Sequence, residues 1–179
     1  MKTQMKKTAL FFAVVISFSI ASFAQTESDA LFERYSGMDG FTSVHITQYM
    51  FQLFADIDTE SEMEEFREMA AQIDRIKILT AENDSANSSR AKSFYSELKK
   101  TIPLDKYEEL MVVNDGDEQV RMYIIKNGKN ISEFLMLVSE PTTAVMISIS
   151  GDIDLDKLAA LSKTMNIEGL EGLDTLNTK

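Results

Sequence analysis

The sequence has no cysteine, no tryptophan and a single histidine. Without cysteine the chain cannot form disulfides, and it cannot carry the lipid-linked cysteine of a bacterial lipoprotein. One histidine and no cysteine also leave too few nitrogen and sulfur ligands for a zinc or copper centre. The lack of tryptophan weakens the case for a paired-carboxylate glycosidase, because no indole is present to stack on a sugar. We therefore expect no metal and no cofactor.

Positive charge is also scarce, with 18 basic residues against 29 acidic ones and a formal net charge of −11. Nucleic acids and anionic membranes are bound by basic patches. The composition therefore predicts no nucleic-acid partner.

The start of the chain has the pattern of a cleavable secretory signal. Lysines precede an apolar run at residues 9–23, and small residues precede the bond between Ala24 and Gln25. A retained membrane anchor is the alternative, but a spanning helix needs about 20 apolar residues and this run is shorter. We predict a signal peptide at 1–24, cleavage between Ala24 and Gln25, and no membrane insertion afterwards. The remaining 155 residues hold 15 basic and 29 acidic side chains, a formal charge of −14.

Residues 25–165 are expected to form one α+β domain, followed by a mobile tail at 166–179. Apolar spacing and turn residues predict a mostly antiparallel sheet, with a four-stranded meander at about 107–150 and helices packed on one face. In chain order the expected elements are a helix at 26–35, a strand at 41–46, a helix at 47–57, an acidic helix from 61, a strand at 75–80, a helix at 91–102, the meander, and a last helix capped by Asp154. Tyr123 and Ile125 share a strand face and would form a contact patch if exposed.

His45 is the only histidine, so a Ser-His-Asp site would have to use it. Ser43 lies two residues away on the same strand face, yet neighbours in one strand cannot form a nucleophile–base pair unaided. A surface or half-buried histidine is the favoured interpretation, and we predict no catalytic residue. Acidic runs at 56–60 and 152–156 supply oxygen atoms that calcium prefers, but neither fits the EF-hand loop, and helix capping is favoured.

Two surface features remain as candidates. The first is an acidic helix face that a basic partner protein would bind, although most such faces are only solvated. Its residues are Glu60, Glu62, Glu64, Glu65 and Glu68. The second is a pair of short segments, 84–86 and 174–176, that resemble acceptor sites for O-glycosylation in Bacteroidetes-type bacteria.

Several segments together resemble the domain-of-unknown-function family numbered 4252, found in exported proteins of Bacteroidetes-type bacteria. They are Phe41–Thr47 with the helix after it, Arg75–Leu79, Tyr107–Gly116, Ser132–Val138 and Ile149–Ile153. The likeness covers about residues 28–165, and the family carries no established activity. It implies a Gram-negative host and a location in the periplasm or at the cell surface. This chain departs from the family's lipoprotein members because it lacks their cysteine.

The sequence thus predicts an exported envelope protein of unknown function that is not an enzyme. Its expected role is a protein-interaction module for an envelope protein whose identity the sequence does not give. The alternative is a carrier or sensor of a small apolar ligand, suggested by the methionine and phenylalanine content. A carrier needs a cavity of several hundred Å³ between sheet and helices.

Overall fold

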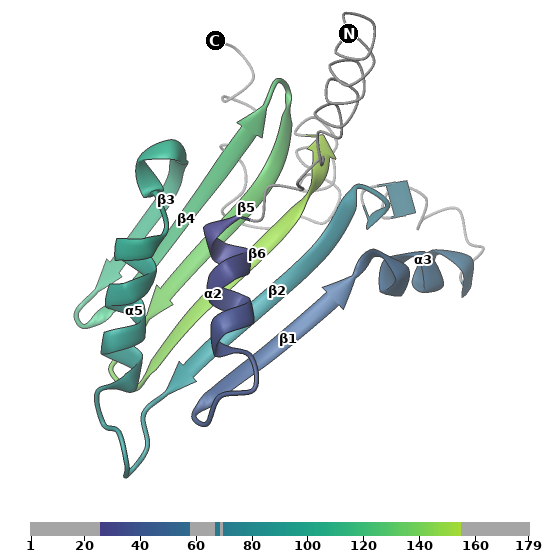
Figure 1. Ribbon diagram of the computed structural model, residues 1–179. Coiled ribbons are helices and arrows are strands. Elements are labelled where there is room, and N and C mark those ends of the chain that lie inside the picture. The colour runs from purple at the N-terminus through teal and green to yellow at the C-terminus, as the bar shows by residue number, and fades with distance from the viewer. Residues whose placement is uncertain (1–25, 58–66, 69, 155–179) are drawn as a thin grey trace, which may run out of the picture.

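A computed structural model describes residues 26–57, 67–68 and 70–154, and its main element is a six-stranded antiparallel sheet (Figure 1). The strand order is β1-β2-β6-β5-β4-β3. The strands are β1 (Phe41–Thr47), β2 (Ile73–Glu82), β3 (Glu108–Asp115), β4 (Glu118–Asn127), β5 (Asn130–Ser139) and β6 (Thr143–Asp154). The predicted α+β class and the meander of β3 to β6 are confirmed.

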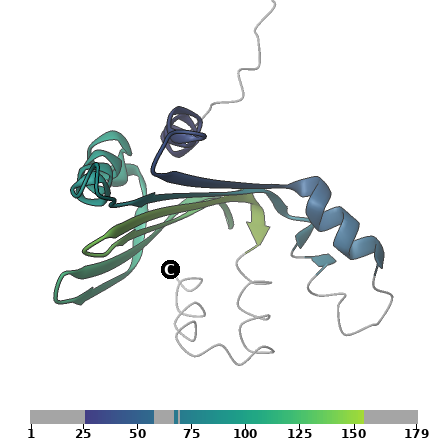
Figure 2. The same cartoon turned by 90° about the horizontal axis from the view of Figure 1, so that it is seen from below.

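Two helices lie on the same face of the sheet, α2 (Glu27–Tyr35) and α5 (Arg90–Thr101), as Figure 2 shows. A short 3-10 helix, η2 (Leu104–Lys106), follows α5. The helix α3 (Gln48–Ile57) continues from the end of β1 and projects beyond the sheet. The prediction of helices on one face therefore holds for α2 and α5, while α3 lies at the β1 edge.

The ends of these elements have local causes. The Thr26 hydroxyl accepts a hydrogen bond from the Asp29 amide at 3.3 Å and caps α2. The Asn83 side chain accepts one from the Ala91 amide at 2.9 Å near the start of α5. Gly116 and Gly128 take positive φ angles of 58° and 66° in the two hairpin turns, a backbone conformation that glycine adopts without strain.

One element boundary was predicted wrongly. The meander was expected to end at about residue 150, but β6 continues to Asp154, which pairs with Asn130 of β5. A register shift between Ile131 and Glu133 of β5 lets β6 continue past Ser150. Gln72 holds this extension: its carbonyl accepts from the Asp152 amide at 2.9 Å, and its side chain accepts from the Asp154 amide at 2.8 Å. The last helix and the tail of the prediction lie outside the described residues.

The main core lies between the sheet and the two helices. Leu31 and Phe32 of α2 and Leu98 of α5 pack against Leu79 and Met146 of the central strands, and all five are buried. Near β1 this core ends in three aromatic rings. Tyr35, Phe41 and Phe94 contact one another there, at centroid distances of 4.5–5.3 Å. Burial of these apolar side chains is what holds α2 and α5 to the sheet.

The opposite side of the sheet, which we call the open face, is the more apolar one. Strand pairing places three rows of side chains across it, because alternate residues of each strand point to the same side. The central row is apolar in every strand, and the flanking rows are mostly so. The rows are Val44–Ile78–Ile147–Met136–Met122–Met111, Ile46–Ile76–Ile149–Phe134–Ile124–Glu108 and Thr42–Thr80–Val145–Val138–Val120–Val113. Neither α2 nor α5 touches this face, and most of its side chains are only partly buried.

Candidate functional site

The only histidine does not form a nucleophile–base pair with its neighbour. His45 and Ser43 point to the same side of β1, as the sequence predicted, and α2 lies on that side. The His45 ring packs edge-on against Phe32 at a centroid distance of 5.9 Å. The Ser43 hydroxyl instead pairs with the Ser36 hydroxyl at 3.0 Å. The geometry thus gives His45 a packing contact, and it leaves Ser43 without a base.

A buried polar cluster lies under the first half of α2 and was not predicted. Its centre is Glu133 of β5, which is 2% exposed. One carboxylate oxygen accepts hydrogen bonds from the Ser28 hydroxyl at 2.5 Å and the Ser148 hydroxyl at 2.7 Å. The other accepts from the Tyr107 hydroxyl at 2.9 Å. Burial, followed by the charge and hydrogen bond of Glu133, raises the pKa of Tyr107 far above its usual value. Tyr107 therefore stays a neutral donor to Glu133.

Charged groups continue the cluster along α2. Arg75 of β2 donates twice to Asp29, from Nε at 3.2 Å and from Nη2 at 2.6 Å. The Lys77 ammonium lies 3.0 Å from an oxygen of Asp29 and 3.0 Å from one of Glu33, and 4.9 Å from the centre of the Phe32 ring. Burial alone would raise the pKa of Asp29, but the hydrogen bonds from Arg75 and Lys77, together with their charges, outweigh it and lower that pKa.

This cluster fastens α2 to the sheet and has the chemistry of a structural network. Its buried groups, among them Glu133, Ser148 and Asp29, are paired within the cluster beneath the helix, whereas Glu33 and Arg75 at its rim reach solvent. Ser150, next to Glu133 across the strands, is the exception, since its buried hydroxyl has no hydrogen-bond partner. Within the described residues, no three of the histidine, cysteine, aspartate and glutamate side chains gather as a metal site would require.

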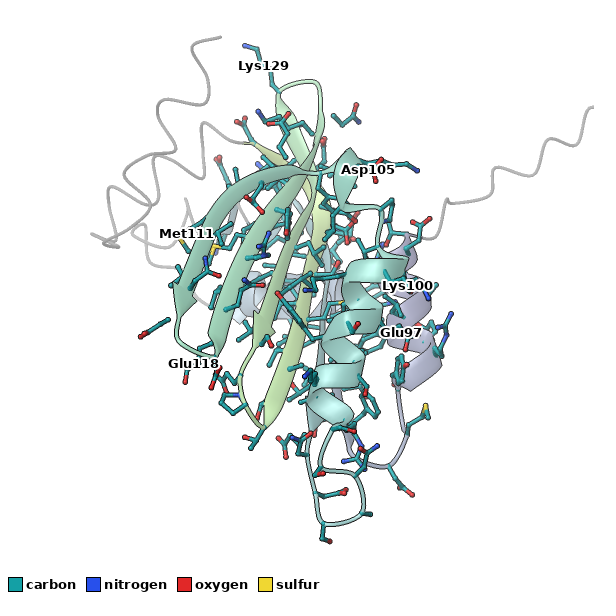
Figure 3. All side chains as sticks on the ribbon, turned by 90° about the vertical axis from the view of Figure 1, so that its left-hand side faces the viewer. Glu97, Lys100, Asp105, Met111, Glu118 and Lys129 are labelled. Carbon is teal, nitrogen blue, oxygen red and sulfur yellow. The ribbon has the colours of Figure 1, made fainter. Side chains whose placement is uncertain are left out.

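The exposed apolar residues form a second kind of candidate site. On α3, Tyr49 is 81% exposed, Leu53 56% and Met50 46%, and we call these three residues the α3 patch. Val44 at the β1 edge is 40% exposed and begins the central row of the open face. At the other edge of the sheet, Met111 of β3 points away from α5, as Figure 3 shows. Exposed apolar side chains on a surface helix are unusual unless another surface covers them.

Most sequence-predicted site residues lie outside the described part of the chain. These are Ala24 and Gln25 at the predicted cleavage site, and Glu60, Glu62, Glu64 and Glu65 of the acidic face. Glu68 is described and is exposed. Tyr123, the other surface candidate, is buried against Tyr107 because its strand face is the one that faces the helices. Ser85 lies in an exposed turn between β2 and α5, and the second glycosylation candidate at 174–176 is not described.

The family profile named "Domain of unknown function (DUF4252)" matches residues 35–161. The chain belongs to the DUF4252 family. The match covers every strand of the sheet together with α3 and α5, and it confirms the resemblance found in the sequence. Comparisons with curated proteins and with solved structures gave no match. In the described part of this DUF4252 protein, no helix is both long and apolar enough to cross a membrane.

Neither the polar cluster nor the open face of this DUF4252 protein was predicted, although each has a signal in the sequence. In β6, Ser148 and Ser150 alternate with Ile147 and Ile149, so one strand face is polar and the other apolar. That alternation identifies two different faces, but it does not say which one the helices cover. Here α2 packs its own polar side chains against the polar face of the sheet. The hydrogen bond between Ser28 and Glu133 joins residues 105 positions apart, so local sequence patterns cannot predict it.

Proposed function

We propose that this DUF4252 protein is exported to the envelope of a Gram-negative bacterium and acts there as a non-enzymatic protein-interaction module. The observation that carries the proposal is the α3 patch. A helix that projects beyond the sheet and exposes Tyr49, Met50 and Leu53 is typical of a surface that a partner covers. Tyrosine and methionine are enriched where protein interfaces are fully buried.

The charge around the patch indicates the chemistry of the partner. The α3 helix leads directly into residues 58–66, which include four of the five glutamates of the predicted acidic face. The predicted mature chain carries a formal charge of −14. Opposite charge steers association and fixes which partner binds. The proposed partner is therefore an envelope protein with an apolar anchor side chain flanked by lysine or arginine.

The absence of an enzyme activity is part of the proposal, and two observations support it. His45 contacts Phe32 rather than a nucleophile. The most concentrated group of carboxylate, hydroxyl and ammonium side chains, around Glu133 and Asp29, is paired internally and lies under α2. Catalytic groups need contact with a substrate in an accessible cleft.

Export is tested by the mass of the protein recovered from the envelope fraction of its host. The expected intact mass is that of residues 25–179, because the signal peptide is removed after Ala24. Recovery of the full chain of 179 residues from the cytoplasm would contradict export.

The interaction is tested by crosslinking the tagged protein in its own envelope, with Leu53→Ser as the variant. Met38→Ser in the turn between α2 and β1 is the matched control, since Met38 is also an exposed apolar residue and lies on neither α3 nor the open face. The expected result is one crosslinked partner peptide that contains basic residues. Its yield should fall at least tenfold with Leu53→Ser, and also when the glutamates at 60, 62 and 64 are replaced by lysine. The control should leave the yield unchanged. A partner captured equally by all variants, or no partner at all, would refute the role of the α3 patch.

The alternative function, a carrier of a small apolar ligand, has less support. The rings of Tyr35, Phe41 and Phe94 are in direct contact with one another, and the leucines of β2, β5 and α5 between helices and sheet are fully buried. Side chains thus occupy the layer in which a carrier would hold its ligand. Native mass spectrometry of the protein from its host would reveal a bound ligand as an excess over the polypeptide mass.

A further inference from the structure

The open face poses a folding problem that the described residues do not solve. A sheet is stable when its apolar side is covered by another layer, and here the helices cover the side that contains Lys77, Glu133 and Ser148. The central row of the open face, from Val44 to Met111, is apolar throughout. A protein exterior ordinarily carries scattered single apolar residues, whereas this face carries a continuous apolar surface across all six strands.

We propose that the segment 155–179 of the same chain folds back and covers the open face. This segment follows β6, which lies inside the sheet between β2 and β5. A chain that leaves a central strand has an apolar surface next to it on each side, and α2 and α5 already occupy one of them. The open face is therefore the nearest surface that the segment can cover.

The sequence of the segment fits this surface. In a helix, which the sequence predicts here, Leu155, Leu158, Ala159 and Met165 would share one side, at the spacing expected of a core-facing stripe. Leucines then follow at every third position, at 170, 173 and 176. The three rows of the open face contain one charged side chain, Glu108 at the β3 edge, so an apolar stripe meets almost no charge there.

The length also fits. Six strands about 4.8 Å apart span roughly 24 Å between the outer two. A helix of residues 155–165 would be about 16 Å long, which is enough to lie across three or four strands. The remaining residues to Lys179 can extend this cover toward the other edge.

Two other occupants are chemically conceivable, a second copy of this chain and a partner protein. The tethered segment has the advantage over both, because a short connection gives it an effective concentration of about millimolar at the face. A second copy also brings the same large negative charge, which opposes self-association. The inference is independent of the proposed partner at α3, since it concerns the isolated protein.

The test uses the absence of natural cysteine. A cysteine is introduced at Ile147, in the centre of the open face, and its alkylation by a maleimide is timed in the purified mature chain. Tyr49→Cys on α3 provides the rate for an exposed thiol. We expect Ile147→Cys to react at least tenfold more slowly than Tyr49→Cys, independently of protein concentration. Met136→Cys in the same row replaces Ile147→Cys if that variant does not fold.

Substitutions in the segment identify the occupant. Leu158→Glu together with Met165→Glu should raise the alkylation rate at position 147 at least fivefold, whereas Lys157→Glu should leave it unchanged. Protection that strengthens with protein concentration and survives the double substitution would assign the face to a second copy and overturn the proposal. Reaction at 147 as fast as at Tyr49→Cys would show the face uncovered and overturn it as well.

Discussion

The ion pairs under α2 give the sharpest stability prediction. Replacing Asp29 by asparagine removes the carboxylate that pairs with both Lys77 and Arg75. The side chains of Asp29 and Lys77 are 7% and 8% exposed, and removing one partner of a buried pair costs about 3–5 kcal/mol. Because Arg75 reaches solvent and Lys77 retains its ion pair with Glu33, we expect a loss of unfolding free energy at the lower end of this range, about 3 kcal/mol. For a domain of this size that is roughly 10 °C in Tm.

The assay is urea unfolding of the mature chain followed by circular dichroism. Glu33→Gln is the control, because Glu33 is exposed and its pair with Lys77 is worth about 1 kcal/mol at most. Adding Lys77→Met to Asp29→Asn removes the buried ammonium that has lost its Asp29 partner and should restore stability to within about 1.5 kcal/mol of the original protein. A loss below about 1 kcal/mol for Asp29→Asn would refute the reasoning, as would a double variant no more stable than the single one.

Three further predictions concern the same domain. The stabilisation from Asp29 is present above its unfolded-state pKa and disappears as the pH falls through the lower pKa of the folded state, so the difference in unfolding free energy between the original protein and Asp29→Asn should shrink below about pH 4. Tyr107→Phe leaves one oxygen of Glu133 without a donor and should cost about 1–3 kcal/mol in urea unfolding, and an unchanged midpoint would contradict the network. Gly128→Ala, at a φ of 66° with open space around it, should cost about 1 kcal/mol from backbone strain alone, whereas Gly128→Asn should cost less.

The local signals of the sequence were enough for most of the fold. Glycines at 116 and 128 flanked by alternating apolar residues identified the hairpins of the meander, and Pro103 identified the end of α5. The end of β6 was missed because it depends on Gln72, a residue more than 70 positions earlier in the chain. The central position of β6, between β2 and β5, is likewise a pairing between distant segments.

The candidate surfaces were harder to predict for a physical reason. A strand pattern with two apolar or half-apolar faces does not say which face receives the helices, and the more apolar one is the natural guess. The helices instead cover the face of Lys77 and Glu133, because α2 supplies Asp29 and Ser28 as partners for them. The exposure of Tyr49 and Leu53 could not be read from the helical periodicity of α3, which equally fits a helix packed on the sheet.

The place of β6 in the sheet also determines the order in which the domain can be completed. The chain makes β1 and β2 as one pair and β3, β4 and β5 as a second group, and only β6, the last strand, joins them. The Ser148 partner of Glu133 arrives with that same strand. A chain that is synthesised or exported N-terminus first therefore holds two unjoined groups of strands until residues up to about 154 have emerged. Its folding then depends on one late pairing between segments distant in the sequence. Such a chain cannot complete its sheet for as long as strand β6 is withheld.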